Sequence, residues 1–158
     1  MKDLKELYKS DGYKSDHYAV EVVADDLYNW KITMLKMPAD SKLAQDLVKL
    51  SEETGRKVNV QLEFLFDAKY PFSPPFIRIV APHISGGYVT FGGGLCMELL
   101  TNEGWSSAYS IESLLIQISA TLVYGGARAV SEYGVRYTLG DAQRGFQDAA
   151  KIHKKYGW

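Results

Sequence analysis

The chain has 158 residues and a formal net charge of −1; 46% of its residues are hydrophobic and 23% are charged. These values are ordinary for a folded protein, so they exclude a disordered or collagen-like chain, and the length predicts a single domain over residues 1–158. The 18 lysine and arginine residues are spread along the chain, so nothing indicates a nucleic-acid partner.

Neither a membrane span nor a secretion signal is predicted. No apolar run reaches the roughly 18 residues that a membrane span requires, and the start, MKDLKELYKS, alternates charges where a signal peptide has an apolar core. The single cysteine, Cys96, excludes an intrachain disulfide and a multi-cysteine metal site. We therefore expect a reducing compartment, the cytoplasm or the nucleus, and no metal centre.

The first half of the chain predicts a short helix followed by strands. Residues 1–9 place apolar side chains on one face at helical spacing. Alternation of apolar and polar residues predicts strands over residues 17–23, 28–35, 58–66 and 76–80. On the second of these strands, one face carries Tyr28, Trp30, Ile32 and Met34.

Three further helices are predicted. Leucines at helical spacing between the second and third strands indicate an inserted helix, which Asp40 or Ser41 can cap. A central helix begins after Ser110, and a last helix runs from about Asp141 to Lys155. The apolar stripe of the central helix consists of Ile111, Leu114, Leu115, Ile118 and Leu122. Because only the insertion separates successive strands, the pattern predicts an α+β fold. The core between sheet and central helix is expected to contain Trp30, Leu62, Phe64, Leu114 and Ile118.

Four segments of this sequence carry a resemblance to a known family. They are YPFSPPF (70–76), GGGLCMELL (92–100), GWSSAYSIESLL (104–115) and the ending IHKKYGW. The whole chain resembles the ubiquitin-conjugating enzymes (UBC fold), and within them the noncanonical Q subfamily. The resemblance implies a four-stranded antiparallel meander sheet with an N-terminal, a central and a C-terminal helix, plus a helical insertion between strands 2 and 3.

The resemblance also implies a role for Cys96, which accepts ubiquitin from an activating enzyme as a thioester and passes it to a substrate, often with the help of a ligase. The implied partners are therefore ubiquitin, the activating enzyme and ligases, with this chain as a monomer. The resemblance implies no bound cofactor, since ATP is used by the upstream activating enzyme. An exposed thiol beside a mobile loop suits this chemistry, and glycines 92–94 offer such an approach. The alternative is a buried cysteine that acts as a small hydrophobe.

The segment ahead of Cys96 departs from the family pattern. Ordinary members carry a His-Pro-Asn triplet whose asparagine is thought to shape the loop and steady the oxyanion; the same window here, residues 86–88, reads Gly-Gly-Tyr. Tyr88 occupies the asparagine position and can donate a hydrogen bond from its hydroxyl. The alternative is a tyrosine that packs the loop onto the sheet.

A general base can come from the last helix. His153 shares a helix face with Phe146 and Ala149, and Trp158 follows five residues later. A packing histidine is one interpretation, and an imidazole that deprotonates an acceptor is the other. Tyr88, His153 and Trp158 together are then expected to replace the missing asparagine, with transfer to hydroxyl groups as well as to lysine.

The resemblance also implies a binding face for ligases and the activating enzyme. The basic residues Lys5 and Lys9, the aromatic Phe72 and the small residue Ala108 match it, while Ser107 stands where the family has a proline. An exposed Phe72 suits an interface anchor, although a plug in the core is the alternative.

Two other functions compete with the transferase. One is a catalytically inactive UBC-like module that binds ubiquitin or a ligase, which the missing triplet favours and Cys96 opposes. The other is a cysteine hydrolase built on Cys96 and His153; the sequence after the cysteine lacks the helix-start signal common at such nucleophiles.

Overall fold

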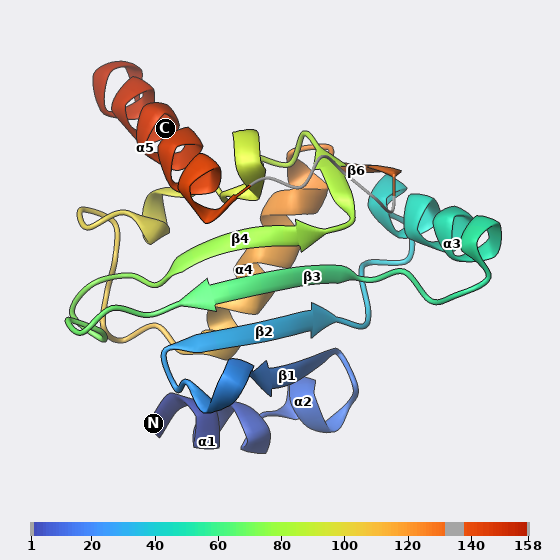
Figure 1. The fold of residues 1–158 in the computed structure, drawn as a ribbon, viewed down its shortest axis with the longest axis horizontal. Helices are drawn as coiled ribbons and strands as arrows, with labels where there is room; N and C mark the ends of the chain where they lie inside the picture. Colours follow the sequence, from blue (N-terminus) through green and yellow to red (C-terminus); the bar gives the residue numbers. More distant parts are fainter. Residues whose placement is uncertain (1, 132–137, 158) are drawn as a thin grey trace.

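A meander sheet forms the centre of the computed structural model, which describes residues 2–131 and 138–157. The strands are β1 (Tyr18–Val22), β2 (Asn29–Met34), β3 (Val60–Leu65) and β4 (Phe76–Ala81), hydrogen-bonded in the order β1-β2-β3-β4. Each neighbouring pair is antiparallel (Figure 1). The α+β class and the four predicted strands are therefore confirmed.

Helices surround the sheet on its edges and on one face. They are α1 (Lys2–Lys9), α2 (Asp11–Lys14), α3 (Lys42–Thr54), α4 (Ile111–Tyr124) and α5 (Leu139–Tyr156). Three short 3-10 helices accompany them: η1 (Val23–Asp25), η2 (Phe91–Gly93) and η3 (Glu98–Leu100). The predicted N-terminal, inserted, central and C-terminal helices are all present, and the one-turn helix α2 was not predicted.

Side-chain caps explain where the long helices begin. The Ser41 hydroxyl accepts a hydrogen bond from the Ala44 amide at 3.1 Å at the start of α3, and Ser110 does the same for α4. Helix α5 begins two residues earlier than predicted because Thr138 caps it in a reciprocal capping box with Asp141.

The core lies between the sheet and α4, which crosses behind the sheet in Figure 1. Across the ladder, Trp30 pairs with Phe64, and both are completely buried. All five residues of the predicted α4 stripe are buried, as are the five predicted core residues. The prediction that Tyr28 shares the strand face of Trp30 is wrong. Tyr28 precedes β2 and is 51% exposed, because the alternation of this strand begins only at Asn29.

A second, two-stranded sheet was not predicted. It pairs β5 (His83–Ser85) with β6 (Arg128–Ser131), and both strands are too short to show an alternating pattern. Arg128 makes a bidentate ion pair with Asp46 of α3, at 2.6 and 2.8 Å, and the Ala129 amide donates to the same carboxylate. The hydrogen bond from Arg128 lowers the pKa of Asp46. This ion pair attaches the inserted helix to the segment that follows α4.

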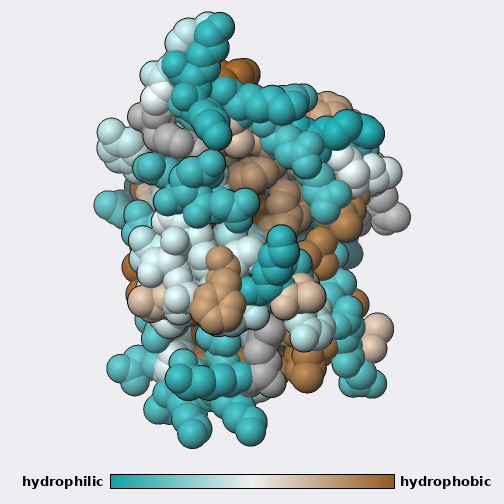
Figure 2. Space-filling view, turned by 90° about the vertical axis from the view of Figure 1, so that its left-hand side faces the viewer, coloured by the Kyte–Doolittle hydropathy of each residue, from teal (hydrophilic) through white to brown (hydrophobic). Residues whose placement is uncertain are grey.

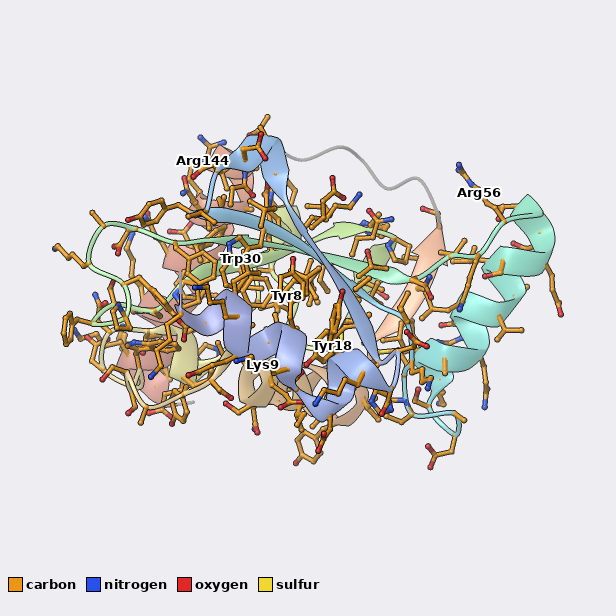
Figure 3. The ribbon with its side chains drawn as sticks, turned by 90° about the horizontal axis from the view of Figure 1, so that it is seen from below. Tyr8, Lys9, Tyr18, Trp30, Arg56 and Arg144 are labelled. Atoms are coloured by element: carbon orange, nitrogen blue, oxygen red, sulfur yellow. The ribbon has the colours of Figure 1, made fainter. Side chains whose placement is uncertain are left out.

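Polar contacts attach the N-terminal helices to α4. The Gly12 amide donates to the Glu112 carboxylate at 2.9 Å, and the Tyr18 hydroxyl lies 2.5 Å from the Ser10 hydroxyl and 3.4 Å from the same carboxylate. Figure 3 shows α1, with Tyr8 and Lys9, in front of the sheet and Trp30 behind it in the interior. Among the described residues, no helix is both long and apolar enough to cross a membrane.

Replacing Phe64 with alanine tests the strand register. Phe64 is fully buried opposite Trp30, so Phe64→Ala is expected to lower the free energy of unfolding by about 3–5 kcal/mol, against a typical total of about 5–15. Denaturant unfolding measures the change. Leu65→Ala, on the half-exposed face of the same strand, is the control and should cost clearly less; equal losses would contradict the register.

Candidate active site

The segment around Cys96 is attached to the edge of the main sheet. Arg78 of β4 bridges to Gly94, and the Leu95 amide donates to the Ile77 carbonyl at 3.2 Å. On the other side, the Cys96 amide donates to the Tyr88 carbonyl at 2.9 Å. The backbone of Cys96 is therefore held between β4 and the residue that occupies the asparagine position.

The glycines ahead of Cys96 are packed tightly, which corrects the expected flexible approach. Gly92 and Gly93 have φ of 86° and 89°, a conformation that other residues rarely adopt. A Cβ on Gly92 would lie 2.5 Å from the Ala142 amide nitrogen, and one on Gly93 would lie 2.3 Å from the Ile79 carbonyl oxygen. These positions are glycine because two backbones approach too closely for any side chain.

Helix α5 supplies the other half of this contact, which the sequence interpretation missed. Ala142 is fully buried, and a Cβ on Gly145 would lie 2.3 Å from the Phe91 carbonyl oxygen. The sequence did contain a signal for this contact. The small residues Ala142 and Gly145 in GDAQRGF are three positions apart and therefore lie on one face of the helix. Helix α5 therefore packs directly on the turn that leads to Cys96.

The Cys96 side chain is only 5% exposed. Burial raises the pKa of its thiol above the ordinary value, because the charged thiolate loses hydration. The expected exposed thiol is therefore wrong for this conformation. The cause is tertiary: Leu95, Cys96 and Met97 are all buried where the segment joins β4.

Tyr88 lies beside Cys96 and has an uncommon backbone. Its φ is 60°, in the left-handed region that glycine favours, while its side chain is 46% exposed. A Cβ on Gly125 would lie 2.7 Å from its ring, so the ring packs against the end of α4. The packing interpretation is supported by the contact of the ring with Gly125. The role of the hydroxyl as a hydrogen-bond donor stays a prediction, because the contact of Tyr88 with Cys96 is made by the backbone.

His153 lies on the last turns of α5, which rise away from the sheet in Figure 1. It is half-buried, and its Nδ1 lies 2.9 Å from the Gly157 carbonyl oxygen. His153 lies on the same helix face as Ala142 and Phe146, which is the face that packs on the turn ahead of Cys96. Trp158 lies outside the described residues.

The residues expected to bind partners lie at the surface. Phe72 is 85% exposed, which makes it a surface residue and not a core plug. The turn that presents it is supported from below, since the Trp105 indole donates to the Pro71 carbonyl at 2.8 Å and Tyr70 packs on Phe66 with ring centroids 4.7 Å apart. The remaining expected contacts are also exposed: Lys5, Lys9, Ser107 and Ala108.

Side chains that could bind a metal do not gather at this site. Within residues 2–131 and 138–157, no group of three or more histidine, cysteine, aspartate or glutamate side chains could hold a metal ion. The segment offers the thiol of Cys96 and, on the residue hydrogen-bonded to its backbone, the phenol of Tyr88. The imidazole of His153 lies on α5, seven residues beyond Phe146.

Comparison with known proteins decides the family. The family model described as "Ubiquitin-conjugating enzyme" matches residues 1–151. The chain belongs to the ubiquitin-conjugating enzyme family. Its fold is similar to that of human ubiquitin-conjugating enzyme E2 G1, with a TM-score of 0.58 and 20% identity over 77% of this chain and 88% of that one.

Curated relatives place this ubiquitin-conjugating enzyme family member in the Q subfamily. The whole chain is 49% identical to ubiquitin-conjugating enzyme E2 Q1 of Homo sapiens and 42% identical to ubiquitin-conjugating enzyme E2 25 of Caenorhabditis elegans, of which it spans 37% and 41%. It is 37% identical to a shorter Q-like ubiquitin-conjugating enzyme of Homo sapiens and covers 95% of that protein. The chain thus spans less than half of the first two relatives and nearly all of the third.

The burial of Cys96 predicts slow alkylation. Because a raised thiol pKa leaves less thiolate at neutral pH, native protein should react with iodoacetamide several times more slowly than unfolded protein at a pH of about 7.5. The rate should keep rising with pH above the ordinary thiol pKa of about 8.5. Mass spectrometry of the adduct measures both, with the chain in denaturant as control. Identical pH profiles for native and unfolded protein would contradict the raised pKa.

Proposed function

We propose that this chain is a ubiquitin-conjugating transferase that carries ubiquitin as a thioester on Cys96. The observation that carries the proposal is the placement of the single cysteine in a segment held between β4 and Tyr88, in a chain whose family match covers residues 1–151. The Cys96 thiolate would attack the activated carboxyl-terminal carbonyl of ubiquitin, displacing the thiolate of the activating enzyme.

The second half of the reaction returns the thiol. An acceptor amine or hydroxyl attacks the thioester carbonyl, the C–S bond breaks, and Cys96 leaves as thiolate while the acceptor loses a proton. Burial helps the chain to carry the thioester, because a thioester is neutral and tolerates a dry environment better than a free thiolate does. It also means that loading depends on the partner that delivers ubiquitin.

The partner surfaces follow from the same proposal. The activating enzyme and ligases would contact the exposed Phe72 and the lysines of α1, Lys5 and Lys9. Ser107 lacks the rigidity of the proline that it replaces in the family pattern, so ligases that depend on this proline should bind more weakly than to ordinary members. The inactive binding module remains the alternative to the transferase, and the family membership favours the transferase.

Incubation with activating enzyme, ATP and ubiquitin tests the proposal. Wild-type protein should gain a ubiquitin adduct that a thiol reductant removes on a denaturing gel. Cys96→Ser should give either no adduct or an oxyester that resists the reductant. Wild-type protein that shows no thiol-sensitive band beside a control conjugating enzyme that does would leave the inactive module as the better description.

We further propose that Tyr88, His153 and Trp158 assist discharge. Support comes from the position of Tyr88 beside Cys96, its uncommon φ of 60°, and the helix face that His153 shares with Phe146. The Tyr88 hydroxyl would donate to the carbonyl oxygen of the thioester, His153 would take the proton of the acceptor, and Trp158 would hold the imidazole or the acceptor. A base of this kind would permit hydroxyl acceptors alongside lysine.

Discharge measurements separate these roles from packing. Tyr88→Phe and His153→Ala should load ubiquitin normally but discharge it to free lysine, threonine or glycerol at least about tenfold more slowly, which corresponds to about 1.4 kcal/mol on the barrier. Lys155→Ala, on the same part of α5, is the control and should discharge at the wild-type rate. Normal discharge by both test variants would contradict the catalytic roles and leave Tyr88 and His153 as packing residues.

A further inference from the structure

A groove runs beside α5 on the face shown in Figure 2. Its volume is about 460 Å³, and it lies between α5, the Pro74–Pro75 turn and residues 100–103. Figure 2 shows brown, apolar side chains gathered beneath the teal upper part of the molecule. Such a volume accommodates a short peptide segment.

The interior of the groove is apolar. The rings of Phe76 and Phe146 pack edge to face with centroids 5.9 Å apart, and Leu100 and Ala150 also line it. Leu100 is 4% exposed and is therefore fixed in place. This lining favours one bulky apolar side chain from whatever occupies the groove.

The rim carries more positive than negative charge. Lys151 and Lys154 of α5 line it, against the single carboxylate of Glu103. Lys154 lies 3.5 Å from Glu103, and Lys151 lies 3.5 Å from Asp148. Because the side chains of both pairs are at least 71% exposed, these ion pairs are weak, and either lysine can bind a carboxylate of an occupant instead.

The groove begins close to Cys96 along the chain. Leu100 is four residues beyond Cys96, and a chain covers at most about 3.6 Å per residue, so the two lie within about 14 Å of each other. A peptide with an apolar residue in the groove would therefore need no more than about four further residues to reach Cys96.

From these observations we infer that the groove binds the polypeptide that accepts ubiquitin. The acceptor segment carries a bulky apolar residue for the groove, acidic residues for Lys151 and Lys154, and the modified lysine, serine or threonine within about four residues of the apolar anchor. This inference rests on the proposed transferase function. It makes the groove a determinant of substrate choice that is separate from the thiol.

Synthetic peptides test the inference on protein that carries no ubiquitin. The probe has one lysine, a spacer of glycine and serine, a phenylalanine and two glutamates, with a fluorescent label. Fluorescence anisotropy should show binding at least about tenfold tighter, about 1.4 kcal/mol, than for the same peptide with serine in place of phenylalanine. Equal binding of the two peptides would overturn the inference.

Variants of α5 locate the binding site. Ala150→Trp fills the groove and Lys151→Glu reverses a rim charge, and each should weaken binding of the probe about tenfold. A probe with lysines in place of the two glutamates should bind Lys151→Glu better than it binds wild type. Lys155→Glu makes the same charge change outside the groove and should bind as wild type, with melting curves showing that each variant is folded. An equal loss in Lys155→Glu would show a general charge effect and overturn the site.

Single-turnover discharge from loaded protein completes the test. The phenylalanine-containing probe should be modified with a half-saturating concentration about tenfold lower than its serine counterpart, while discharge to free lysine stays the same in Lys155→Glu and wild type. Binding without preferential modification would overturn the acceptor assignment. A failure of wild type to load ubiquitin would instead contradict the proposed function, and the anisotropy result would still decide whether the groove binds the peptide.

Discussion

The position of Cys96 depends on a steric contact between two backbones. Helix α5 meets the turn at Gly92 so closely that a Cβ there would lie 2.5 Å from the Ala142 amide nitrogen, and Gly145 admits the Phe91 carbonyl in the same way. Such contacts leave no room for adjustment, because interiors are packed at crystal-like density. The C-terminal helix and the thiol segment are therefore one structural unit, attached to β4 through Gly94 and Leu95.

In the proposed transferase, the buried thiol and the neighbouring surfaces would have separate roles. Burial raises the pKa of the Cys96 thiol, which leaves less of the reactive thiolate at neutral pH. Reactivity would then come from partners that bind elsewhere. The exposed Phe72 lies on a turn supported by Trp105, and the groove beside α5 begins within four residues of Cys96. A delivering enzyme and an acceptor could use these two surfaces separately, since Phe72 is not among the residues that line the groove.

Tyr88 is held by contacts on two sides. Its carbonyl accepts from the Cys96 amide, its ring lies against Gly125, and its side chain is partly in solvent although its backbone is left-handed. A strained residue persists only where its surroundings hold it. Here the surroundings are the Cys96 segment on one side and the end of α4 on the other. A substitution that moves the backbone of Tyr88 would therefore disturb both segments.

Local patterns in the sequence determined the elements of the sheet core, the capping of α4 by Ser110 and the five-residue stripe on α4, because alternation, helical spacing and cap residues act within a few positions. For α3 the sequence left the cap open between Asp40 and Ser41, and the structure shows Ser41. The motif around Cys96 likewise indicated the family and the candidate thiol. Only the tertiary structure decided that the glycines ahead of it are packed and not flexible, that the thiol is buried, that Arg128 reaches Asp46 across the chain, and that α5 forms a groove with residues 100–103. Each of these depends on the distance between backbones that are far apart in sequence, and no local pattern encodes that distance.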